Sequence, residues 1–314
     1  MQRRRSLISL AAVGVLSMAT ACAGDDLPDE GAGPGAGSGS AGTVTLATQS
    51  FDEAALITAM YSGVLSNAGY DVTVKEVGRR DVYVGEMPDS VQIAPEYLGG
   101  IADFMNTTVN GVDAEPITSA DADATLEAVT PLLEAQGLTL LEPSPATSQN
   151  AYFVTQEYSD AEGVTALSDL EGSSVVLAAN EDCPGRADCE AGLEEVYGIN
   201  VTKVLPLGFA SPQTYQSVLD GESQVGQTGT LDGTLESQGL VLLEDDKGIQ
   251  PAQNIIPLVS QEFLDSNGGV EPLLDDLMAA LDNETLAGLI ARVTVDRETP
   301  EDVADEFLAE EGLV

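Results

Sequence analysis

Near the start of the folded part of the chain, two stretches alternate apolar and polar residues, and a stretch with helical spacing separates them. Residues 44–48 (VTLAT) and 70–74 (YDVTV) alternate with a period of two, which predicts strands. The apolar residues between them recur at three- and four-residue intervals, and Ser50 and Glu53 provide a capping box for the start of a helix. This order of elements predicts a βαβ unit, and therefore parallel strands.

The stretch Val91–Gly100 (VQIAPEYLGG) predicts a short strand, a bend and the start of a helix. Val91 and Ile93 share one strand face, and Pro95, which cannot donate a ladder hydrogen bond, predicts the end of the strand. Ligands of open α/β sheets lie where strands end, so we expect Tyr97 at the mouth of a cleft. The alternative is that Tyr97 only packs against the turn.

The rest of the chain continues the alternation of strands and helices in two sets. A helix at 124–136 and a strand at 138–141 precede a break at 143–145 (PSP), and a domain change is expected near residue 148. The second set predicts strands at 152–154, 175–178, 201–205 and 224–227 and helices at 192–197 and 214–219. The Asp232–Gly233 turn is expected to lead back, with residues 240–243 resuming the first lobe and helices at 273–281, 285–293 and 303–308. Two α/β lobes joined by two crossings result, without an internal repeat.

The first 42 residues have the pattern of an exported lipoprotein. Basic, apolar and small residues precede Cys22 in that order, which predicts a signal peptide over 1–21 and lipid on Cys22. The apolar run is shorter than the ~20 residues of a spanning helix. Residues 22–42 are rich in Gly, Ala and Ser and predict a flexible tether. The folded body is thus expected at the outer face of the cell membrane, attached through lipid only.

Composition and charge exclude several classes of function. The 314 residues contain no histidine, which excludes Ser-His-Asp triads, Cys-His dyads and His-ligated metals, so we expect no enzyme, cofactor or metal. A carboxylate-pair enzyme remains formally open, although 53 scattered acidic residues single out no pair. The net charge of −42 repels phosphate backbones, so nucleic acid is not an expected partner.

Three cysteines are an odd number for an exported protein. Lipid on Cys22 leaves Cys183 and Cys189, which we expect to form a disulfide in the oxidising compartment that the signal implies. A metal site is the competing interpretation. Two thiols without histidine make a poor zinc site.

Four motifs in register resemble the glycine betaine/choline-type substrate-binding proteins of osmoprotectant ABC importers, in their actinobacterial lipoprotein form. They are TLATQSFDE at 45–53, PEYLG at 95–99, NAY at 150–152 and LLEDDKG at 242–248. The resemblance covers 43–310 and implies the type II periplasmic-binding-protein fold, an α/β fold with a ligand cleft between two lobes. It implies lobe I from 43 to 148 and from 234 to 314, and lobe II from 149 to 233.

In that family, aromatic rings hold the quaternary ammonium group of the solute. The resemblance implies that Tyr97 and Tyr152 keep this role, with Asn150 beside them, whereas Glu190 and Gly229 stand where aromatic residues are usual. It places Thr230 and Asp232 in the turn after that lost ring. It also aligns Arg186, inside the expected disulfide loop, with the basic residue that holds a betaine carboxylate. Glu190 itself is a candidate contact.

Further candidates lie on loops of lobe I that face the cleft in this fold. Arg79, Arg80 and Tyr83 follow the second strand, and an arginine fork can grip a carboxylate through two hydrogen bonds. A surface pair that balances acidic neighbours is an equally weighted interpretation of the two arginines. Gln49 is a candidate polar contact. Four other aromatic residues are predicted to lie in the core: Phe51, Phe153, Tyr197 and Tyr215.

We therefore predict a monomeric, lipid-anchored receptor that closes on a small solute and delivers it to an ABC permease. The solute expected from the resemblance is glycine betaine, choline, carnitine or a similar compound. One alternative is a receptor of the same fold for an anionic or aromatic solute, favoured by the thinned cage and the extra arginines. A second alternative is a surface sensor that does not take part in transport.

Overall fold

The computed structural model describes residues 41–77 and 79–314. The predictions for the signal peptide, for Cys22 and for nearly all of the tether fall on residues outside this part. Within the described ranges, no helix is both long enough and apolar enough to cross a membrane.

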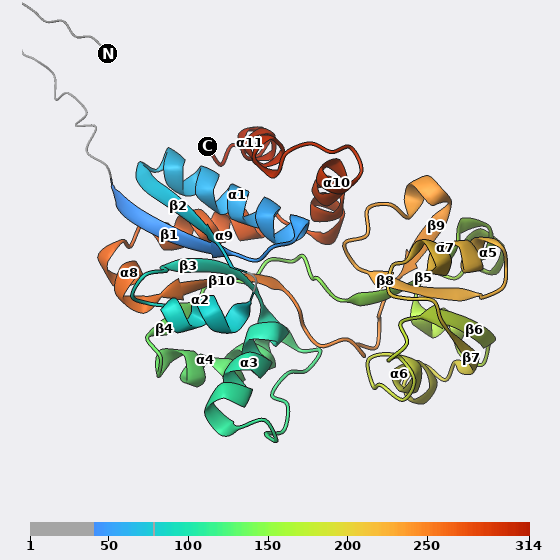
Figure 1. The fold of residues 1–314 in the computed structure, drawn as a ribbon. Coiled ribbons are helices and arrows are strands. Elements are labelled where there is room, and N and C mark those ends of the chain that lie inside the picture. Colours follow the sequence, from blue (N-terminus) through green and yellow to red (C-terminus); the bar gives the residue numbers. More distant parts are fainter. Residues whose placement is uncertain (1–40, 78) are drawn as a thin grey trace, which may run out of the picture. The chain divides into compact units, whose positions relative to one another are not determined.

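The first sheet has five strands in the order β2-β1-β3-β10-β4 (Figure 1). Its strands are β1 Gly42–Thr48, β2 Tyr70–Glu76, β3 Ile93–Tyr97, β4 Leu138–Leu140 and β10 Ile255–Ser260. β1 pairs in parallel with β2 and β3, as the βαβ pattern predicts, whereas β10 runs antiparallel to β3 and β4. The sheet is therefore mixed, and β1, β2 and β3 end at the same edge.

Helices cover both faces of this sheet. They are α1 Asp52–Asn67, α2 Arg80–Glu86, α3 Leu98–Asn110, α4 Ala122–Glu134, α8 Gln261–Ser266, α9 Val270–Ala279, α10 Asn283–Thr294 and α11 Pro300–Glu310. Alternate residues of β10 show the division, because Ile255 and Val259 pack with α1, α9, α10 and α11, whereas Ile256 and Leu258 pack with α2, α3 and α4. The first lobe thus has two apolar cores, one on each side of its sheet.

The second sheet has the strand order β7-β6-β8-β5-β9 (Figure 1). Its elements are β5 Asn150–Thr155, α5 Gln156–Glu162, β6 Ser174–Ala179, α6 Glu190–Glu195, β7 Asn200–Pro206, α7 Pro212–Leu219, β8 Val225–Gly229 and β9 Leu240–Leu243. β6 is parallel to β7 and β8, and β5 is antiparallel to β8 and β9. The two predicted α/β lobes are confirmed.

Two crossings, 141–149 and 244–254, connect the sheets and run beside each other. The Ser148 amide donates to the Gln253 carbonyl at 3.0 Å, and Gln149 Nε2 donates to the Pro251 carbonyl at 2.7 Å. A backbone bridge also pairs Thr147 with Asn254. The two crossings are therefore hydrogen-bonded to each other along part of their length.

The predicted return to the first lobe at residue 234 was placed too early. Residues 240–243 form β9, which pairs with β5 in the second sheet, for example Leu243 with Tyr152. A short apolar strand fits the edge of either sheet, so its pattern alone did not identify its partner. The chain returns after 243, and β10 is the first strand back in the first sheet.

Three local predictions were also wrong. No strand was expected after residue 243, but β10 lies there; it is buried along its whole length and lacks the alternation of a half-buried strand. Pro95 does not end β3, which continues to Tyr97 and places Pro95 opposite Pro257. The capping box is absent, since Phe51 is the N-cap of α1 and makes no side-chain cap.

Candidate functional site

In each lobe, several of the candidate residues lie at or just after the carboxyl ends of parallel strands. In the first sheet, β1, β2 and β3 lead to Gln49, Arg79 and Tyr97. In the second sheet, β6, β7 and β8 lead to three segments, 180–189, 207–211 and 230–233. This edge of a sheet is where α/β proteins bind their ligands.

Arg80 holds a buried carboxylate of the protein. Its Nε and Nη2 donate to the two carboxylate oxygens of Glu96 at 2.8 and 2.9 Å, and Glu96 is fully buried. The Tyr83 hydroxyl and the Tyr97 amide also donate to Glu96. Burial and the Glu96 charge raise the pKa of Tyr83, so its hydroxyl remains a donor. Glu96 is thus a fully satisfied buried anion.

The other two lobe I candidates near this pair have different surroundings. Gln49 Nε2 donates to the Tyr83 hydroxyl oxygen at 3.5 Å, which joins it to the Glu96 cluster. Arg79 points away from that cluster and forms an exposed ion pair with Asp81. The two adjacent arginines therefore bind two different carboxylates of the protein. The interpretation of Arg79 as a surface residue fits this geometry.

Tyr97 is fixed by a second, partly buried carboxylate. Its hydroxyl donates to Glu53 Oε1 at 2.6 Å, and Ser148 on the first crossing donates to Glu53 Oε2 at 3.3 Å. Burial raises the pKa of Glu53, and these two hydrogen bonds oppose the rise. The Phe51 ring stacks on Tyr97 with centroids 6.3 Å apart. Because Phe51 is 43% exposed, its prediction as a core residue was wrong.

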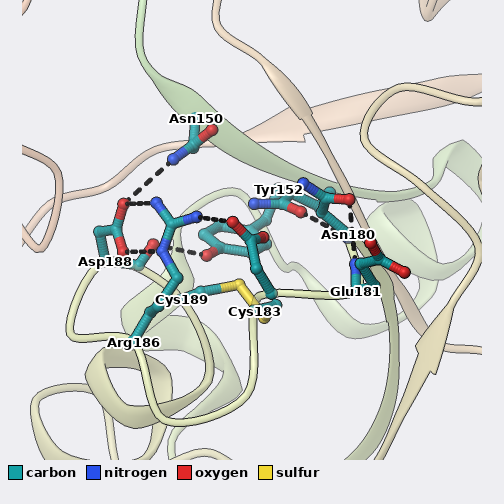
Figure 2. A network of polar contacts seen from close by, with 10 residues as sticks. Asn150, Tyr152, Asn180, Glu181, Cys183, Arg186, Asp188 and Cys189 are labelled. Atoms are coloured by element: carbon teal, nitrogen blue, oxygen red, sulfur yellow. Dashed lines mark hydrogen bonds and ion pairs between the residues drawn. A yellow bond between two sulfur atoms is a disulfide. The ribbon is translucent and has the colours of Figure 1, made fainter.

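In the second lobe, the predicted disulfide is present and closes the loop that carries Arg186 (Figure 2). Arg186 Nε donates to Asp188 Oδ1 at 2.9 Å, and Nη1 donates to Asp182 Oδ2 at 2.9 Å. Unlike Arg80, Arg186 is 40% exposed in its side chain. Its predicted disulfide-closed setting is confirmed, and its role toward a solute stays a prediction.

Asp188 is the centre of the polar contacts in this region (Figure 2). Its carbonyl accepts from the Tyr152 hydroxyl at 3.0 Å and from Gln250 Nε2 at 2.8 Å, and Asn150 Nδ2 donates to its carboxylate at 3.3 Å. Burial and the Asp188 charge raise the pKa of Tyr152. Tyr152 is 1% exposed, and its ring packs in the core of the lobe. Its hydroxyl reaches the Arg186 loop, where it donates to the Asp188 carbonyl.

Three further predicted residues hold loops at this edge. The Thr230 hydroxyl donates to the Thr147 carbonyl and accepts from the Gln149 amide, which ties the turn after β8 to the first crossing. Asp232 accepts from the hydroxyls of Tyr215, Thr228 and Thr234. Glu190 begins α6 and accepts from the Gly185 amide at 2.9 Å, inside the disulfide loop.

Two adjoining cavities border the crossings. The larger, about 640 Å³, is lined in part by Tyr152 and Thr230, and the smaller, about 240 Å³, by Arg186 and Asp188. Asn150 and Gln250 line both cavities. Four predicted lobe II residues therefore surround one pair of cavities: Asn150, Tyr152, Arg186 and Thr230.

Sequence reasoning missed four residues that organise these groups: Glu53, Glu96, Asp188 and Gln250. Glu96 and Glu53 lie in motifs that the resemblance quoted, but nothing in the pattern distinguishes them from the other acidic residues among the 53. Asp188 lies two residues after Arg186, a spacing that would have suggested an ion pair. Within residues 41–77 and 79–314, no cluster of three or more His, Cys, Asp or Glu side chains could hold a metal ion.

Comparison with known proteins identifies relatives along almost the whole described chain. Residues 42–310 match the family described as "Substrate binding domain of ABC-type glycine betaine transport system". The glycine-betaine-binding protein of Pseudomonas aeruginosa is 28% identical over 291 residues, which cover 89% of this chain and 91% of the relative. The glycine betaine-binding protein YehZ of Escherichia coli is 27% identical over 273 residues, which cover 83% and 88%.

Solved structures agree with this match. The structure of apo YehZ from Escherichia coli has a TM-score of 0.73 at 25% identity and covers 87% of this chain and 99% of that chain. A structure described as a glycine betaine/carnitine/choline ABC transporter has a TM-score of 0.73 at 18% identity, with 86% and 99% covered. The two-lobed fold expected from the sequence is thereby confirmed.

Proposed function

The chain belongs to the family of substrate-binding domains of ABC-type glycine betaine transport systems, and from this we propose that it captures glycine betaine or a related quaternary ammonium solute such as choline or carnitine. It is the substrate-binding component of an ABC importer, and its partner is the membrane permease. The observation that carries the proposal is the match over 42–310, which spans both lobes and both crossings.

The charges at the candidate site support a cationic solute over an anionic one. Each of the three candidate arginines already has a carboxylate partner in the protein: Arg79 has Asp81, Arg80 has Glu96 and Arg186 has Asp188. A solute carboxylate, whether it belongs to an anion or to a betaine, has to compete with one of these protein carboxylates. A quaternary ammonium group displaces none, because it needs only ring faces and nearby negative charge.

Solute binding is proposed to involve both lobes. Tyr97, held by Glu53, supplies a ring from the first lobe, and Tyr152 and Arg186 lie at the cavities beside the crossings. We propose that Arg186 takes the carboxylate of a betaine-type solute. Because these residues belong to different lobes, closure of the lobes is coupled to binding.

The remaining expectations complete the proposal. Lipid on Cys22 holds the monomeric protein at the outer face of the cell membrane, and the protein does no chemistry on the solute. Conversion of Cys22 to Ala should release the folded body from the membrane fraction. Unchanged membrane association and processing of the Cys22→Ala protein would contradict the anchor.

A ligand panel tests the proposed function. Isothermal titration calorimetry of the folded body with glycine betaine, choline, carnitine, glutamate and benzoate should give saturable binding for at least one quaternary ammonium compound and none for the two anions. Saturable binding of glutamate or benzoate, with no binding of the three cations, would support the anionic alternative instead.

A further inference from the structure

We propose that Phe209 is an aromatic wall of the solute site in the second lobe and contacts the quaternary ammonium group. The inference rests on the proposed function, because such a cation has no N–H group and is held by ring faces and dispersion. Phe209 lies on the loop between β7 and α7. Its ring is 45% exposed.

Strand directions place this loop at the ligand-binding edge of the sheet. β6, β7 and β8 are mutually parallel, so the segments that follow them lie at the same edge. The first segment carries Arg186, the second carries Phe209, and the third carries Thr230 and Asp232. Phe209 is therefore on the same edge as the lobe II candidates.

The backbone around Phe209 is tied down on both sides. The amides of Leu207 and Gly208 donate to the Ala179 carbonyl at the end of β6, and the Ala210 amide donates to the Gln227 carbonyl in β8. Ala210 has a φ of +46°, a left-handed conformation that residues with a side chain rarely adopt. Residues held in such conformations are common at ligand sites, and the backbone hydrogen bonds fix the position of the loop that carries the ring.

The ring adjoins Gly229, whose strand partner lines the cavities. Gly229 leaves open the space beside its Cα, and the Phe209 Cζ lies 3.5 Å from the point where a Cβ would stand. The Gln149 carbonyl oxygen lies 3.6 Å from the same point. Gly229 pairs with Asn150 across the sheet, and Asn150 lines both cavities. The exposed ring thus adjoins the residues that surround the cavities.

The turn that follows Gly229 carries an acidic residue, Asp232. The Asp232 amide donates to the Gly229 carbonyl at 3.2 Å, so the carboxylate is on the turn that Phe209 adjoins. The donors to that carboxylate are hydroxyls and the Thr234 amide, which are neutral and leave its charge in place. An exposed ring next to a turn that carries a carboxylate with only neutral hydrogen-bond donors favours a bound cation.

Three substitutions and a control test the inference by calorimetry with glycine betaine and choline. Phe209→Ala and Phe209→Leu should each weaken binding of both solutes roughly five- to thirtyfold, since both lose the ring and Leu keeps apolar volume. Phe209→Trp should stay within about twofold of the wild type. Leu219→Ala is the matched control, because Leu219 is 43% exposed in the same lobe, and it should leave binding unchanged.

The outcomes separate this inference from the proposed function. If the wild type binds none of glycine betaine, choline and carnitine, the proposed function fails, and the inference that rests on it fails too. If the wild type binds and Phe209→Ala binds equally well with the same thermal midpoint, the inference is wrong while the function stands. If Phe209→Leu binds as tightly as the wild type, an apolar side chain of any kind suffices at this position, and the inference is also wrong. If Phe209→Ala binds solute as the wild type does but uptake in cells is lost, the inference is wrong and Phe209 contacts the permease instead.

Discussion

Arg80 in the first lobe and Arg186 in the second were both candidates to hold a solute, and their surroundings differ. Arg80 forms two hydrogen bonds with Glu96, whose side chain has no exposed surface. Arg186 pairs with Asp182 and Asp188, whose side chains are 57% and 23% exposed. If Arg80 turned to a solute, Glu96 would remain buried and unpaired, whereas water can solvate the partners of Arg186.

This difference separates a structural ion pair from a pair that can exchange its partner. Removing one member of a buried pair is strongly unfavourable, because the remaining charge has neither water nor a partner. An exposed pair contributes little in the folded state and gives up its partner at little cost. The comparison therefore assigns Arg80 to the stability of the first lobe and leaves Arg186 for the solute.

The largest expected effect follows from breaking the buried pair. Arg80→Ala should lower the free energy of unfolding by about 3–5 kcal/mol, since it leaves the Glu96 carboxylate buried without its cation. Urea unfolding followed by circular dichroism measures this change. Arg79→Ala is the matched control, because its neighbour Asp81 is solvated, and it should not move the midpoint. Equal midpoints for Arg80→Ala and the wild type would contradict the structural role of Arg80.

A smaller effect is expected from the loop that presents Arg186. Replacing Cys183 and Cys189 by Ser opens a loop whose ends are six residues apart and should lower the free energy of unfolding by about 2 kcal/mol. The Asp188 carbonyl would also hold Tyr152 and Gln250 less firmly, so solute binding should weaken. Stability equal to that of the oxidised wild type would show that the disulfide does not hold this loop.

The substitution Arg186→Ala tests whether the exposed arginine is available to a solute. We expect it to weaken glycine betaine binding by about 1–2 kcal/mol, which allows for its exposure, because the solute carboxylate loses charged donors. Choline has no carboxylate, so its affinity should be unchanged. Competition titrations with both solutes measure the two effects together. An equal loss for choline would mean that Arg186 acts through the shape of the loop.

The smallest expected effect is that of pH. The chain has no histidine, so we expect glycine betaine affinity to be flat between pH 6 and 8. A slope in this range that disappears in Glu53→Gln would show that the Glu53 pKa extends into it. Burial raises that pKa, so Glu53 binds its proton more tightly in the folded chain, and its contribution to stability is lost as pH rises through the folded pKa. The stability of Glu53→Gln relative to the wild type should therefore increase with pH.

Local patterns predicted most of the fold because strands and helices leave their periods in the sequence. They failed where position depends on partners distant in the chain. β9 has the pattern of an edge strand for either sheet, and only its pairing with β5 decides the lobe. β10 lies between β3 and β4 and is buried on both faces, so its sequence shows no alternation.

The site could be predicted only as far as its motifs reached. The motifs supplied Tyr97 and Tyr152, and the alignment of the disulfide loop supplied Arg186. Neither showed which groups hold these residues, because Glu53 and Asp188 act through tertiary hydrogen bonds. The sequence also showed Gly229 as a missing ring. The exposed ring beside it comes from Phe209, and only the pairing of β6, β7 and β8 brings those positions together.

The most direct test of the account compares glycine betaine with 3,3-dimethylbutanoate, its isostere in which carbon replaces the ammonium nitrogen. Both compounds have the same shape and carboxylate, so calorimetric titration of the wild type isolates the cationic charge. Rings that select a cation predict that glycine betaine binds at least about tenfold more tightly. Equal or tighter binding of the isostere would contradict recognition of the quaternary ammonium group.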